Sequence, residues 1–131
     1  MEMVISFEGG KIVNAHYKDM IIKTDQSVSA GGEGSAPEPF TLFLASIGTC
    51  AGIYVKSFCD QRGISTDKIS LVQSMSYNKE NKLIEKINIE IRLPDDFPEK
   101  YKEAVIKAAD LCTVKRHLAN PPCIEVKTIT G

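Results

Sequence analysis

A stripe of apolar side chains through residues 40–61 constrains the fold more than any other feature of the chain. Large apolar residues recur there at spacings of three and four, which is the period of an amphipathic α-helix. They are Phe40, Phe43, Leu44, Ile47, Tyr54, Val55 and Phe58. Pro37 and Pro39 suit the start of a helix, and Gly63 suits its end. The pattern therefore predicts one long helix over residues 40–61.

Small residues occupy the middle of this predicted helix, where Gly48 and Gly52 lie on either side of Cys50. A glycine inside a helix costs about 1 kcal/mol relative to alanine. Close approach of another helix or of another stretch of backbone would offset that cost. We therefore expect this helix to lie at the centre of the fold and not on its surface.

The other elements alternate between strand patterns and helix patterns. A long, polar, glycine-rich loop is expected at 25–39, and loops of that length in small domains are more often functional than not. Strands are expected at 3–7, 12–17, 20–24, 69–77, 82–93 and 124–128, and further helices at 99–111 and 113–118. This order predicts an α+β fold with an antiparallel or mixed sheet.

Composition narrows the class of protein. The 131 residues suit a single domain over 1–131, and the charged fraction of 25% is that of an ordinary globular protein. A formal charge of -1 leaves no basic excess for nucleic acid. No apolar run approaches the roughly 18 residues that a membrane span needs. An acidic residue at position 2, Glu2, does not fit a secretory signal. We expect a cytoplasmic protein.

Four cysteines lie at positions 50, 59, 112 and 123. Their spacing is not that of a zinc site, and His16 and His117 are expected to be surface or structural residues, so we expect no structural zinc site. Cys50 and Cys59 lie on opposite sides of the predicted helix, about 13 Å apart along its axis, and cannot bond. Cys59 and Cys123 are expected to be structural.

Cys112 is the second cysteine that a reactive site could use. It starts the short predicted helix, with Lys115 and Arg116 close by, and both features lower the pKa of a thiol. Cys50 and Cys112 lie on the apolar stripes of two helices, so packing of these helices could bring the thiols together. The alternative is that both are inert core residues, as buried cysteines commonly are.

Two segments resemble the motifs of a known family. Residues 37–52, PEPFTLFLASIGTCAG, resemble the first cysteine motif of the OsmC/Ohr family. Residues 108–118, AADLCTVKRHL, resemble its second motif, a cysteine at the start of a short helix. The order of strands and helices also agrees, so the resemblance covers nearly the whole chain. It is strongest to the OsmC-like branch.

The resemblance implies an intertwined homodimer, in which sheets wrap two long central helices and the active sites draw on both chains. It also implies a peroxiredoxin-like organic hydroperoxide reductase, acting in oxidative or osmotic stress defence without a cofactor. Cys50 would be the peroxidatic thiolate, Cys112 the resolving thiol, and an external dithiol the reductant. Phe40, Phe43 and Tyr54 would favour apolar peroxides.

The chain departs from the family pattern at one point. Studied members pair an acidic residue, about ten positions before the first cysteine, with an arginine from the N-terminal strands. Phe40 occupies that position here, Glu38 is the nearest acid, and no arginine precedes Arg62. Arg116 is the candidate substitute. The departure leaves a second reading open: a non-catalytic protein that binds a small apolar ligand or senses thiol redox state, with a pocket at the dimer interface.

Overall fold

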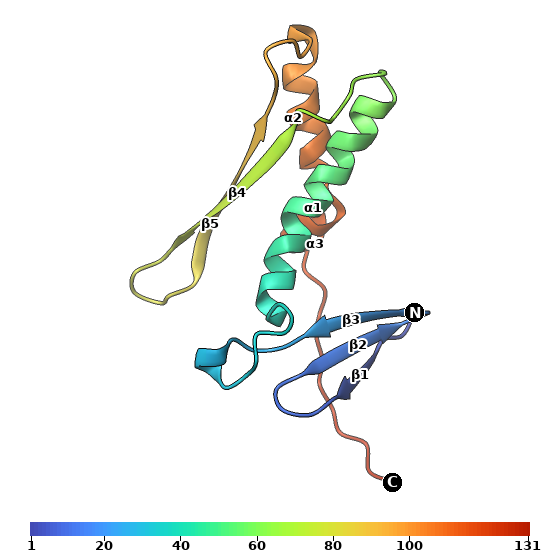
Figure 1. Ribbon diagram of the computed structural model, residues 1–131, viewed down its shortest axis with the longest axis vertical. Helices are drawn as coiled ribbons and strands as arrows, with labels where there is room; N and C mark the ends of the chain where they lie inside the picture. Colours follow the sequence, from blue (N-terminus) through green and yellow to red (C-terminus); the bar gives the residue numbers. More distant parts are fainter. The chain divides into compact units, whose positions relative to one another are not determined.

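The computed structural model describes all 131 residues, which form two compact units, residues 1–45 and 46–131. The boundary falls inside the long helix α1, Pro39–Asp60 (Figure 1). This helix confirms the prediction for residues 40–61. The strands and helices of the whole chain confirm the α+β class. The single domain expected over 1–131 stays a prediction.

The first unit contains a three-stranded antiparallel sheet in the order β1-β2-β3. Its strands are β1 (Val4–Phe7), β2 (Val13–Tyr17) and β3 (Met20–Thr24). All three strands were predicted, and a turn containing Gly9, whose φ is 93°, joins the first two. In the register, Ile5, Ala15 and Ile22 lie side by side across the sheet.

One face of this sheet carries apolar side chains that the chain leaves exposed. Side chains two residues apart along a strand share a face. Ile5 and Phe7 therefore lie on the same face as Ile22, and Phe7 is 85% exposed. Neither outer strand of the sheet has a second neighbour within the chain. The face and both edges are free to meet another surface.

Asp25 organises the loop that the sequence analysis placed at 25–39. Its carboxylate is buried and accepts the N–H groups of Gln26 (2.7 Å), Glu33 (3.3 Å) and Ser35 (3.1 Å), and the Ser35 hydroxyl (2.7 Å). The Ser35 bonds are the main cause that lowers the pKa of Asp25 from 3.8 to about 2. A side chain at Gly32 would collide with the Gln26 carbonyl, so the chain turns tightly around this carboxylate.

The loop also contains a short 3₁₀ helix, η1 (Val28–Ala30), and returns beside its own start, where Asp25 N–H donates to Pro37 C=O at 3.2 Å. α1 begins two residues later. The loop is therefore a closed, hydrogen-bonded turn and not an open linker.

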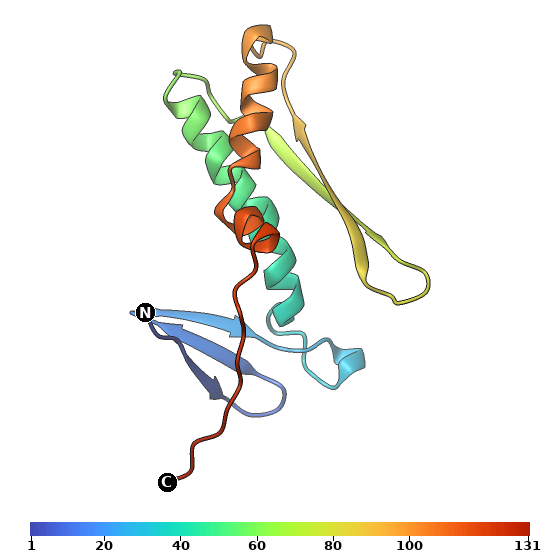
Figure 2. The ribbon, with the colours of Figure 1, turned by 180° about the vertical axis from the view of Figure 1, so that it is seen from behind.

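The second unit holds a β-hairpin beside a helical layer. Its elements after α1 are β4 (Ser70–Tyr77), β5 (Ile84–Arg92), η2 (Glu99–Tyr101), α2 (Lys102–Asp110) and α3 (Thr113–Ala119). Leu71 pairs with Ile91 and Met75 with Ile87, so the apolar residues share one face as their alternation predicted. Figures 1 and 2 both show the second half of α1 next to α2 and the hairpin alongside them.

The core of this unit joins α1 to α2. Val55, Phe58 and Cys59 of α1 are buried with Phe97 and Val105, and Val105 is fully inaccessible to solvent. Isoleucines and leucines from the hairpin pack against this cluster. Burial of a side chain of this size is worth about 1.5–3 kcal/mol, which makes the cluster the main force holding α2 against α1.

By length and composition alone, α1 could cross a membrane, because it contains a window of mean hydropathy 1.5. The expectation that no segment is long and apolar enough is therefore wrong for this helix. Core helices of soluble proteins meet the same criterion. Within the chain, Val55, Phe58 and Cys59 of this helix are buried against the rest of the second unit.

The glycines of α1 differ from what the sequence analysis expected. At Gly48, an added Cβ would lie 2.5 Å from the side-chain oxygen of Gln73, so the close neighbour is strand β4 and not a helix. At Gly52, nothing lies within 4 Å of such a Cβ. Within the chain, only Gly48 is thus explained by a close approach.

The prediction of a final strand at 124–128 is wrong within the single chain. Residues 120–131 have no strand structure and extend from the end of α3 (Figure 2). The segment has apolar residues separated by polar ones, as in a strand. Its apolar side chains are all more than 80% exposed: Ile124, Val126 and Ile129. A strand needs the hydrogen bonds of a neighbouring strand, and the chain supplies no partner to this segment.

The Asp25 carboxylate predicts an acid-sensitive contribution to stability. Because its pKa in the folded protein is depressed, the contribution is complete above the ordinary value of 3.8 and is lost as the pH falls toward about 2. We expect Asp25→Asn to lower the free energy of unfolding at pH 6 and to flatten its fall between pH 4 and pH 2. Urea unfolding at a series of pH values measures both effects. Asp19→Asn, at an exposed position, is the matched control, and an unchanged pH slope in Asp25→Asn would contradict the assignment.

Candidate thiol site

The fold brings together two cysteines that lie 62 positions apart in the sequence. Cys50 lies near the middle of α1 and is partly buried. Cys112 is the N-cap residue of α3, directly after the turn that ends α2. The Cys112 thiol is within hydrogen-bonding reach of the Cys50 sulfur. Both cysteines are free thiols.

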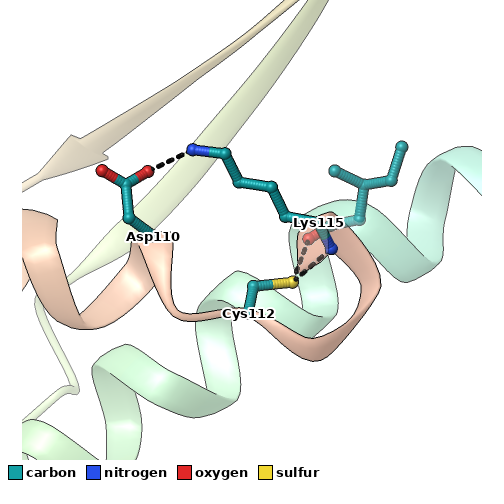
Figure 3. Close-up of polar contacts among 4 residues, drawn as sticks. Asp110, Cys112 and Lys115 are labelled. Carbon is teal, nitrogen blue, oxygen red and sulfur yellow. Dashed lines mark hydrogen bonds and ion pairs between the residues drawn. The ribbon is translucent and has the colours of Figure 1, made fainter. Parts of the chain in front are cut away.

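Cys112 is held in place by contacts on two sides (Figure 3). Its sulfur accepts the Lys115 N–H at 3.5 Å and lies 4.0 Å from the Ile47 carbonyl oxygen, to which the thiol can donate. The single S–H proton therefore has two acceptors within reach, the Ile47 oxygen and the Cys50 sulfur. Only 1% of the Cys112 surface is exposed.

The pKa of Cys112 is raised, which corrects the sequence-based expectation. Burial is the main cause, and the neighbouring Cys50 sulfur raises the pKa further. The expectation relied on the charges of Lys115 and Arg116. The Lys115 ammonium is paired with Asp110 at 2.6 Å, as Figure 3 shows, and the Arg116 side chain is exposed. Desolvation of the buried thiolate therefore outweighs the Lys115 and Val114 N–H groups, which act to lower the pKa.

The pKa of Cys50 moves in the opposite direction. Burial acts to raise it, but three hydrogen bonds outweigh burial and hold the pKa below the ordinary 9.0. They come from the Val114 N–H, the Cys112 thiol and the Thr113 N–H. Hydrogen bonds to the charged form favour that form. The pair is thus one thiol whose pKa lies below the ordinary value and, beside it, one whose pKa lies above it.

The remaining residues predicted for the site lie in several places. The Glu38 carboxylate accepts the Ser27 N–H at 3.3 Å, a bond within the loop before α1. Phe40 and Phe43 stack on each other with ring centroids 5.6 Å apart, and both are exposed. Tyr54 donates to, or accepts from, the Thr113 hydroxyl at 2.9 Å. The roles expected of Glu38, Phe40, Phe43, Tyr54 and Arg116 stay predictions.

The sequence analysis missed Thr113 and Val114. Their contribution comes from backbone N–H groups at the start of α3, which every residue type supplies, so no residue pattern marks them. The one available signal was the position of Cys112 immediately before a helix start. That signal pointed to Cys112, where burial outweighs the N–H groups, whereas on Cys50 the N–H groups of Thr113 and Val114 contribute to a net lowering of the pKa.

The other thiols and histidines are separate from this pair. Cys59 belongs to the core and Cys123 is exposed in the C-terminal segment. His16 bonds the Ser6 hydroxyl at 2.8 Å, and a ring nitrogen of His117 lies 2.7 Å from the Thr113 carbonyl oxygen. No group of three or more histidine, cysteine or acidic side chains is arranged to hold a metal ion.

An apolar cavity of about 290 Å³ lies on the other side of Cys112. Isoleucine and alanine side chains from α1, β5 and α2 form most of its wall, and the Asp110–Lys115 ion pair lies at it. The lining residues are Ile47, Ala51, Ile87, Ile89, Ile91, Ile106, Ala109, Asp110, Cys112, Lys115 and Leu118. Cys50 is not among them.

Comparisons with known proteins agree with this fold. A sequence model of the family described as OsmC-like protein matches residues 32–127. No curated protein matches the chain. Among solved structures, a Psychrobacter arcticus 273-4 protein named for osmotic stress induction and a detoxification response superposes with a TM-score of 0.71 at 17% identity. The match covers 87% of this chain and 85% of that one.

Two further structures bear on the family. An OsmC-like protein from Mycoplasma pneumoniae matches with a TM-score of 0.70 at 13% identity, over 92% of this chain and 87% of that one. The organic hydroperoxide resistance protein OhrB of Bacillus subtilis matches with a TM-score of 0.54 at 17% identity, over 92% and 93%. At such identities the similarity to these structures establishes the fold.

The opposite shifts of the two thiols predict a fixed order of labelling. Because the thiolate is the reactive form, we expect iodoacetamide at pH 7 to label Cys50 well before Cys112. The labelling rate of Cys50 should reach half its maximum below pH 9, and that of Cys112 above it. Mass mapping of peptides after timed quenching measures both rates, with exposed Cys123 as the internal standard for reagent access. Labelling of Cys112 before Cys50 would contradict the described geometry.

Proposed function

Because the chain belongs to the OsmC-like protein family, we propose that it is a thiol-dependent peroxidase that reduces organic hydroperoxides in oxidative or osmotic stress defence. The observation that carries this proposal is the Cys50–Cys112 pair. Hydrogen bonds, two of them from backbone N–H groups, lower the pKa of the Cys50 thiol. The Cys112 thiol, whose pKa is raised, lies within hydrogen-bonding reach of it. These are the properties that a peroxidatic and a resolving cysteine need.

The reaction has three balanced steps. The Cys50 thiolate attacks the terminal oxygen of the hydroperoxide, the O–O bond breaks, and the alkoxide leaves and takes up a proton to become the alcohol. Cys50 is then a sulfenic acid. The Cys112 sulfur attacks that of Cys50, forming a disulfide and releasing water. An external dithiol reduces the disulfide by thiol–disulfide exchange and is itself oxidised to a disulfide.

The N–H groups of Thr113 and Val114 support this proposal in a chain that lacks an N-terminal arginine. In the family pattern, the acid–arginine pair orients the thiolate and the peroxide. Here the two N–H groups would stabilise the Cys50 thiolate, because hydrogen bonds to the charged form favour that form. Orientation of the peroxide remains for other groups. Arg116 on α3 and Glu38 before α1 are the proposed candidates, and Phe40, Phe43 and Tyr54 are the proposed apolar contacts for the substrate.

We propose that the protein works as a homodimer in the cytoplasm, where thiols stay reduced. Three features of the chain support a second copy as the partner. The β1–β3 sheet exposes an apolar face, the segment after α3 carries exposed Ile124 and Val126 with no strand beside it, and Gly52 faces open space. Exposed apolar surface on this scale is typical of protein interfaces.

The cavity behind Cys112 favours one alternative, a protein that binds a small apolar ligand without catalysis. Its wall is formed mainly by isoleucine and alanine side chains, and its volume of about 290 Å³ is close to that of small-molecule sites. In this alternative the cysteine pair serves at most as a redox sensor. Loss of thiols on exposure to peroxide distinguishes the two functions.

The peroxidase proposal predicts the outcome of a thiol count. After one equivalent of cumene hydroperoxide, we expect wild type to lose two of its four thiols and to form a Cys50–Cys112 disulfide. Cys50→Ser should lose none rapidly. Cys112→Ser should stop at a sulfenic acid on Cys50, which dimedone traps. Mass mapping identifies each product, and Cys123→Ser is the control that should behave like wild type. Four thiols that persist for hours in wild type would overturn the proposal.

The dimer proposal predicts a mass and a variant that changes it. In sedimentation equilibrium we expect wild type at twice the chain mass of 14.4 kDa. Phe7→Glu should shift the protein toward the monomer, because a carboxylate on the apolar sheet face would be buried at the interface without a partner. Lys23→Glu, on the opposite face of the same sheet, is the matched control and should stay dimeric. A wild-type mass of 14.4 kDa at micromolar concentration would contradict the proposal.

A further inference from the structure

A hydroxyl pair joins α1 to α3 next to the thiol site. The Tyr54 hydroxyl lies 2.9 Å from the Thr113 hydroxyl, across 59 positions of sequence. Tyr54 follows Cys50 by four residues on α1, so the two side chains project from the same face, about one helical turn apart. Tyr54 therefore reaches α3 from a point adjacent to Cys50.

Thr113 belongs to the group that contacts Cys50. The N–H groups of Thr113 and Val114 are two of the three donors to the Cys50 sulfur, and Cys112, the third, is the residue before Thr113. All three donors thus lie in the first turn of α3. Whether these donors point at the sulfur depends on the position of that turn relative to α1. Their hydrogen bonds weaken steeply when the distance or angle departs from the optimum.

Contacts of Cys112 and Thr113 also join this turn to α1. The Cys112 sulfur lies at 4.0 Å from the Ile47 carbonyl, a weak sulfur contact on the side of the turn next to the cavity. α3 has seven residues and none of them is fully buried, so packing holds it less firmly than the core holds α2. The Tyr54–Thr113 bond is the direct hydroxyl contact between the two helices.

We propose that Tyr54 and Thr113 are positioning residues: their hydroxyl bond holds the first turn of α3 over Cys50 so that its N–H groups point at the sulfur. Neither hydroxyl touches the sulfur or the substrate in this role. The catalytic consequence rests on the proposed peroxidase function. The effect on Cys50 ionisation does not, because it follows from the geometry of the donors alone.

Other titratable groups surround this contact and enter any pH profile. The Cys112 thiol hydrogen-bonds to the Cys50 sulfur, and the Asp110–Lys115 ion pair links the end of α2 to α3. His117 lies 2.7 Å from the Thr113 carbonyl oxygen, and Arg116 is exposed on the same helix. All of them are unchanged in the variants below, so they cancel when variant and wild-type profiles are compared.

Alkylation of Cys50 by iodoacetamide between pH 5 and pH 10, followed by mass mapping, tests the proposal. Tyr54→Phe and Thr113→Val each remove the bond, so we expect the midpoint of the labelling profile to rise and the rate at pH 7 to fall roughly 3- to 10-fold, since a tenfold change in thiolate corresponds to about one pKa unit. Thr113→Ser keeps a hydroxyl and should label like wild type. The double variant Tyr54→Phe/Thr113→Val should match the single variants, because all three lack the same bond.

Tyr77→Phe is the matched control, since it removes an exposed tyrosine hydroxyl on β4. Far-ultraviolet circular dichroism verifies that the variants are folded, and Tyr54→Phe keeps the aromatic ring. Unchanged midpoints in both single variants, a Thr113→Ser profile like that of Thr113→Val, or additive effects in the double variant would each overturn the proposal. The measurement uses no peroxide, so a failed peroxidase assay alongside shifted midpoints would reject the proposed reaction and leave the positioning role standing.

Discussion

The packing of α1 against α2 is the interaction on which the thiol site depends. Val55 and Phe58 are buried together with Val105 of α2, and this core fixes where α2 runs and where it ends. The chain then turns at Leu111 and delivers Cys112 and the start of α3 next to Cys50. Because both cysteines lie at or next to helices that share one core, their contact follows from burial of apolar side chains several residues away.

Within this pair, one physical cause acts on both sulfurs and a second separates them. Burial raises the pKa of each thiol. Cys50 additionally receives N–H groups from the first turn of α3, which stabilise its thiolate. Cys112 receives the Lys115 N–H but lies almost fully buried beside Cys50, so its proton is retained. Hydrogen bonds to Cys50 and burial of Cys112 therefore shift the two pKa values in opposite directions.

The first unit contributes a different kind of constraint. Its loop is internally complete, since the Asp25 carboxylate accepts N–H groups from along the turn and the loop closes on itself. Its sheet is not complete, because the apolar face containing Phe7 remains exposed. The exposed segment after α3 has the same character. These exposed apolar surfaces are what supports the proposed association with another copy.

Elements whose signal is local can be predicted from the amino-acid sequence alone. Periods of three to four and of two placed α1, the sheet strands and the β4–β5 hairpin within a few residues, because side-chain burial alternates with those periods. Tertiary structure decided the rest. The segment 124–128 has a strand pattern but no neighbouring strand to bond with, and Lys115 was expected to act on Cys112 but is paired with Asp110. The Tyr54–Thr113 bond joins residues 59 positions apart, and only the folded chain brings their hydroxyls within reach.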